Sequence, residues 1–109
     1  MIVTGQLISA SQPGPVDISF VTEHDDVAMV EVNFDRPRRP WIASSETDRE
    51  DGSIEIDVHL LPSDDTPPNH RDDQIHLNFL VTGAKHLLVL HDSWRYSAYI
   101  VFADRGAAR

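Results

Sequence analysis

Apolar and polar side chains alternate along much of this chain with a period of two residues. In the clearest case, the segment 53–61, every second position from Ile54 to Leu60 is apolar, and the positions between them hold Glu55, Asp57 and His59. A period of two is typical of a β-strand that buries one face and exposes the other. This segment is therefore predicted to be a strand with a polar outer face.

Similar or weaker alternation predicts further strands, and no segment of helical length keeps the i, i+3, i+4, i+7 apolar spacing of an amphipathic helix. The predicted strands are 2–10, 16–23, 27–35, 53–61, 75–82, 86–90 and 96–103. The last three hold most of the long apolar side chains and are separated by Thr82-Gly83-Ala84 and Asp92-Ser93, so we expect a three-stranded antiparallel meander. Segments 86–90 and 96–103 are apolar on both faces, which predicts interior strands.

The length of 109 residues fits one domain, 1–109, with a single core. Short strands separated by turn residues are typical of two packed sheets. The predicted fold class is therefore all-β, a single-domain antiparallel β-sandwich of about seven strands, with a small β-barrel as the alternative. Residues 105–109 show no pattern and are expected to form a flexible tail.

The charge balance bears on the partner. The chain carries 18 acidic and 9 basic residues, a net charge of −9. This charge repels phosphate backbones and attracts basic protein surfaces, so it disfavours direct binding to nucleic acid. A simpler alternative is that the acidic residues serve solubility alone.

Carboxylates gather on the polar faces of two predicted strands. Glu31 and Asp35 share one face of the segment 27–35, and Glu55 and Asp57 share one face of the segment 53–61. If these strands are neighbours, the four side chains form one acidic sheet face, where like charges oppose each other at a cost in stability. Such a face suits a basic partner, for example a nuclease or a toxin domain.

The irregular segment 36–52 is predicted to be a loop or an edge excursion rather than a central strand, because Pro37 and Pro40 cannot donate hydrogen bonds to a sheet. It holds both signs of charge, and internal pairing is its simplest role. Alternatively, Trp41 anchors a protein contact that Arg38 and Arg39 orient, since Trp and Arg dominate interface energies.

Six histidines raise the alternative of a small metal-binding protein or enzyme. A hairpin turn at Gly83-Ala84 would place His76 opposite His91, and His59 lies on another predicted strand. This register depends on the assumed turn, and the chain has no HxH or HExxH spacing. The prediction is therefore no metal and no cofactor, with His59, His76 and His91 as the alternative metal site.

The sequence gives no support for cysteine chemistry, nucleophilic catalysis or membrane insertion. The chain has no cysteine, no nucleophile motif and no apolar run of membrane-spanning length. We therefore predict a cytoplasmic protein that is not an enzyme and does not bind membranes, and that binds and inhibits a basic protein. It is similar in size and charge to small immunity proteins and other inhibitors, although no motif links it to one family. A second alternative is a homo-oligomeric assembly domain that joins through strand edges or Trp41.

Overall fold

A computed structural model describes residues 1–10, 16–23, 27–34, 41–61, 74–83, 87–94 and 97–104, and these form eight strands. No helix among these residues is long and apolar enough to cross a membrane. The strands are β1 (Ile2–Ala10), β2 (Val16–Glu23), β3 (Val27–Phe34), β4 (Trp41–Asp48), β5 (Ile54–Leu61), β6 (Ile75–Thr82), β7 (Leu87–Trp94) and β8 (Ser97–Asp104).

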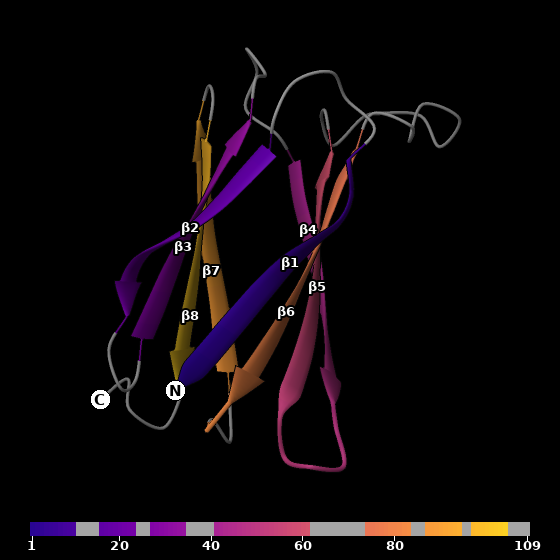
Figure 1. Cartoon of the computed structure of the whole chain (residues 1–109), viewed down its shortest axis with the longest axis vertical. Coiled ribbons are helices and arrows are strands. Elements are labelled where there is room, and N and C mark those ends of the chain that lie inside the picture. Colours follow the sequence, from indigo (N-terminus) through magenta and orange to yellow (C-terminus); the bar gives the residue numbers. More distant parts are fainter. Residues whose placement is uncertain are drawn as a thin grey trace.

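The strands form two antiparallel four-stranded sheets that pack face to face. The first sheet has the order β1-β6-β5-β4 and the second has the order β2-β3-β8-β7. Figure 1 shows β2, β3, β8 and β7 together on one side and β4, β5 and β6 on the other. The predicted all-β sandwich is confirmed, and because the sheets are separate, the barrel alternative is wrong.

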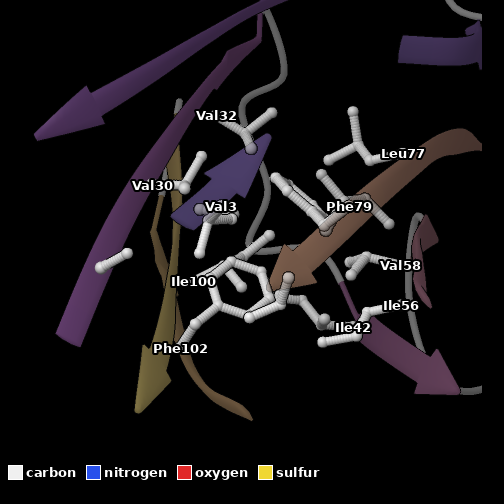
Figure 2. Close-up of a cluster of buried hydrophobic side chains, with 14 of the residues drawn as sticks. Val3, Val30, Val32, Ile42, Ile56, Val58, Leu77, Phe79, Ile100 and Phe102 are labelled. Atoms are coloured by element: carbon white, nitrogen blue, oxygen red, sulfur yellow. The ribbon is translucent and has the colours of Figure 1, made fainter. Parts of the chain in front are cut away.

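The core lies between the two inner faces, and both sheets supply it through alternate residues. In β5 and β6 every second residue is buried, as the sequence pattern predicted. Phe79 of β6 and Phe102 of β8 are fully buried, and their rings meet across the sheets with centroids 4.9 Å apart (Figure 2). Burying each such side chain contributes about 1.5–3 kcal/mol, so this pair is a main link between the sheets.

Gly5 of β1 makes room for one of these rings. It pairs with Phe79 in the neighbouring strand. A Cβ atom at position 5 would lie 2.5 Å from Cε1 and 2.7 Å from Cδ1 of Phe79. The ring cannot retreat easily, because it is fully buried and packed against Phe102. Glycine is therefore required here by close packing rather than by backbone conformation.

The predicted meander of the last three strands is wrong. β6 belongs to the first sheet, whereas β7 and β8 belong to the second. The reason is that β1 and β5 already occupy both edges of β6, so the chain must cross to the other sheet after Gly83. β8 is an interior strand as predicted, but β7 lies at a sheet edge and runs through Asp92-Ser93, the predicted turn.

The segment 36–52, predicted to be a loop or an edge excursion rather than a central strand, contains the edge strand β4. Trp41–Asp48 pairs with β5 along its whole length and forms an edge of the first sheet. Ser44 and Glu46 pair with the buried Val58 and Ile56, yet both are exposed. An edge strand tolerates polar residues at such positions, which also discourage pairing with other chains. This is why β4 shows no apolar alternation in the sequence.

We predict that Gly5→Ala lowers the free energy of unfolding by about 1–3 kcal/mol, because the added methyl group overpacks the Phe79 ring. In a Phe79→Leu background the same substitution should cost much less, since the ring is gone. Chemical denaturation of the two single variants and the double variant measures this coupling. Thr4→Ala, at the exposed neighbouring position, is the control. Equal costs in both backgrounds would show that the ring is not the obstacle.

Candidate functional site

The outer face of the first sheet carries a row of polar side chains from β5 and β6. The buried residues of these strands point into the core, so the residues between them point outward. The register places His59 opposite His76 and Asp57 opposite Asn78. Directly opposed residues in neighbouring strands are close enough for their side chains to interact.

His59 and His76 form a stacked pair. Their ring centroids lie 4.2 Å apart, and the ring planes differ by 13°. Nε2 of His76 lies 3.0 Å from Oδ1 of Asp57, one diagonal step along the sheet. Nδ1 of His59 lies 3.3 Å from Oε1 of Gln74, which directly precedes β6. Each ring is therefore held both by its neighbour and by a side-chain oxygen.

Asp57 is the centre of this network. Its Oδ1 receives a hydrogen bond from Nδ2 of Asn78 at 3.1 Å in addition to the contact with His76. These two hydrogen bonds, that of His76 first, lower the pKa of the Asp57 carboxyl below its ordinary value. Nδ2 of Asn78 also approaches Oε2 of Glu55 at 3.3 Å, so one amide joins the two carboxylates.

The turn between β4 and β5 is organised by Asp51. Its Oδ1 accepts hydrogen bonds from the backbone N–H of Ser53 at 2.9 Å and from the Ser53 hydroxyl at 2.5 Å. The hydroxyl bond and the backbone bond lower the pKa of Asp51. Gly52 has a φ of 87°, a left-handed conformation that glycine adopts without strain. An aspartate at this turn is thus explained by local structure.

Arg49 lies in the same turn and is the cation nearest to the carboxylates within the described residues. Its Nη1 is 3.9 Å from Oε2 of Glu55, and its Nε is 4.0 Å from Oδ1 of Asp51. Both contacts are long and largely exposed to solvent, so each contributes little to stability. A hollow of about 330 Å³ lies beside them on the sheet face, lined by Thr4, Gly5, Gln6, Arg49, Glu55, Asn78 and Leu80.

Glu31 does not belong to this face. It lies on β3 in the second sheet, opposite Tyr99 of β8, and its Oε1 accepts a hydrogen bond of 2.9 Å from Nδ2 of Asn33. Hydrogen bonds from Tyr99 and then Asn33 lower the pKa of Glu31. Because β3 and β5 are in different sheets, the condition for one shared acidic face, that these two strands are neighbours, is not met. Glu31 and the pair Glu55 and Asp57 face opposite sides of the sandwich.

The remaining residues of the predicted contact surface are only partly placed. Trp41 begins β4, where it pairs with Leu61 at the edge of the first sheet. Asp35, Arg38 and Arg39 lie outside the residues that the structure describes.

The predicted histidine register is corrected as well. His91 lies on β7 in the second sheet and pairs with Ile100, so it does not oppose His76. His59 takes that place instead. The alternation of β5 and β6 puts both histidines on polar faces, but the register depends on how β5 and β6 pair, and no turn motif in the sequence fixes this. Among the residues described, no three His, Asp or Glu side chains form a group that could hold a metal ion.

No protein-family model, curated protein or solved structure matches this chain.

We predict that Asp57 makes stability fall in acid. Because its pKa is lower in the folded protein than in the unfolded chain, the ionised form stabilises the fold above the unfolded value of about 4. This contribution is lost as the pH falls through the lower, folded pKa. The difference in unfolding free energy between the wild type and Asp57→Asn should be constant above about pH 5 and shrink below about pH 4.

Urea denaturation at several pH values measures this difference. Asp17→Asn, an exposed carboxylate on β2 in the other sheet, controls for the loss of one surface charge. A difference between wild type and Asp57→Asn that does not change with pH would contradict the assigned role of Asp57.

Proposed function

We propose that this protein acts by binding a basic protein partner, without catalysis, through the acidic segment around the β4–β5 hairpin. One observation carries the proposal: residues 46–57 hold six carboxylates and a single cation, Arg49. The carboxylates are Glu46, Asp48, Glu50, Asp51, Glu55 and Asp57.

The position of these groups supports a role in association. Residues 44–52 are all exposed. They comprise the C-terminal part of the edge strand β4 and the turn that follows it. Glu55 and Asp57 extend the negative charge from the turn onto the outer sheet face. Concentrated charge of one sign raises the rate at which an oppositely charged protein arrives, and the effect weakens with salt.

The hydrogen bonds on the outer face of the first sheet also support a role in binding a partner. Asp57 is held by His76 and Asn78, and Glu55 by Asn78, so their positions are fixed before any partner arrives. Groups fixed in advance lose less entropy on binding. A partner whose own groove binds phosphate, such as a nuclease or toxin domain, would meet these carboxylates in place of phosphates. The role that fits is inhibition or immunity, with a cytoplasmic location as part of the proposal.

We predict that Asp48→Lys weakens association about tenfold at low salt, because it reverses an exposed charge in the acidic segment. Asp17→Lys is the matched control: it makes the same charge change at an exposed position of the other sheet. The partner is first captured from cells of the native host and released by salt. Its association rate with the wild type and both variants is then measured at several ionic strengths. Equal rates for the two variants, or rates independent of salt, would argue against the proposal.

A second candidate function, self-association, rests on a different observation. Among the residues whose side-chain exposure the structure describes, the large exposed apolar side chains all lie on β1 or β2: Ile2, Leu7, Ile8, Phe20 and Val21. Each of these two strands forms one edge of its sheet. Exposed edges with apolar side chains favour pairing with a second copy of the chain.

If self-association occurs through these edges, the dimer should persist at 1 M salt, since apolar contacts are not screened. Val21→Lys should then shift the protein to the monomer. Light scattering after size-exclusion chromatography measures the mass, and Asp17→Lys on the same strand controls for the added charge. A monomer at all salt concentrations would exclude this function and leave the acidic segment as the candidate.

A further inference from the structure

The hollow on the outer face of the first sheet has an apolar centre and a polar surround. It has a volume of about 330 Å³ and is lined by residues of three adjacent strands and one turn residue. Leu80 of β6 lies between its partners in the two neighbouring strands, Thr4 of β1 and Glu55 of β5. One row farther along β6, Asn78 pairs with Gln6 of β1. The register therefore surrounds one apolar side chain with polar ones.

Most of these polar side chains can accept hydrogen bonds. Oε2 of Glu55 lies 3.3 Å from Nδ2 of Asn78 and 3.9 Å from Nη1 of Arg49, and Oε1 of this carboxylate takes part in neither contact. Nδ2 of Asn78 donates to two carboxylates, so Oδ1 is the part of this amide that remains to accept. Thr4 and Gln6 add a hydroxyl and an amide oxygen.

Arg49 is the turn residue that lines the hollow, and its side chain is loosely held. Its nitrogens lie 3.9 Å from Glu55 and 4.0 Å from Asp51, beyond hydrogen-bond range, and its side chain is 46% exposed. Its backbone, in contrast, is fixed in the turn by hydrogen bonds with Ser53 and Gly52. The side chain can therefore rotate away from Glu55 while the turn stays intact.

We propose that this hollow receives one arginine side chain of the basic protein partner, and that Arg49 moves aside when it enters. This inference rests on the proposed function and adds a specific contact to it. A guanidinium has five N–H donors in a planar fork, so it can donate two bonds to the Glu55 carboxylate and further bonds to Asn78 and Gln6. Its aliphatic stem packs on Leu80. A lysine carries the same charge without the fork, so arginine is preferred.

The first test needs neither the partner nor a variant. The peptide N-acetyl-Gly-Arg-Gly-amide is added at low salt to the purified full-length protein, and binding is followed by NMR. The peptide should shift the signals of residues 4–6, 55 and 78–80 in a saturable way. The control peptide has citrulline in place of arginine, which keeps nearly the same shape without the charge. Equal shifts with both peptides, or shifts centred elsewhere, would overturn the proposal.

The second test compares variants in the same titration. Glu55→Gln should weaken binding of the arginine peptide about fivefold, because it removes the charge that the guanidinium meets. Glu46→Gln is the matched control: it makes the same change at an exposed residue of β4 that does not line the hollow. Equal effects of these two variants would assign binding to the overall negative charge and overturn the proposal.

Arg49→Gln has an expected effect of the opposite sign. It should strengthen binding of the arginine peptide about threefold, since it removes the cation that competes for Glu55. Weaker binding by this variant would overturn the proposal, because Arg49 would then hold the ligand instead of making way for it.

The arginine site and the proposed function can fail separately. With the captured partner, Glu55→Gln should mainly raise the dissociation rate, whereas Asp48→Lys lowers the association rate. Salt-dependent association of the partner without any binding of the arginine peptide would remove only the arginine site. Binding of the peptide at the hollow, together with partner association that does not depend on salt, would remove only the proposed role of the acidic segment.

Discussion

The contact between Phe79 and Phe102 is the constraint from which the rest of the structure follows. Each ring belongs to an interior strand, β6 in one sheet and β8 in the other, so their packing holds the sheets at a fixed separation. Gly5 belongs to the same contact, because a larger residue there would displace the Phe79 ring. With the inner faces fixed in this way, the alternation of each strand decides which side chains face outward, and therefore which of them can meet.

The same constraint builds the polar network of the first sheet. Phe79 and Ile56 are paired inner residues, and stepping outward from that pair along β5 and β6 brings Asp57 opposite Asn78 and His59 opposite His76. A shift of one residue would turn the apolar residues outward, so the register of the core also sets the register of the site. The hydrogen bonds from His76 and Asn78 to Asp57 are thus a consequence of core packing.

The sequence predicted where the strands lie along the chain far better than which strands pair with each other. β5 and β6 have one buried and one solvated face, so alternation identified them, and the same signal placed Glu55 and His76 on polar faces. β4 was not predicted as a regular strand, because its inward positions beyond Ile42 are polar, which an edge strand permits. Strand order was predicted wrongly, because it depends on which strand edges are already paired. β6 pairs with β1 and β5, and these long-range pairings are not encoded by local turn residues. The site inherited this error, with His91 assigned the place that His59 holds.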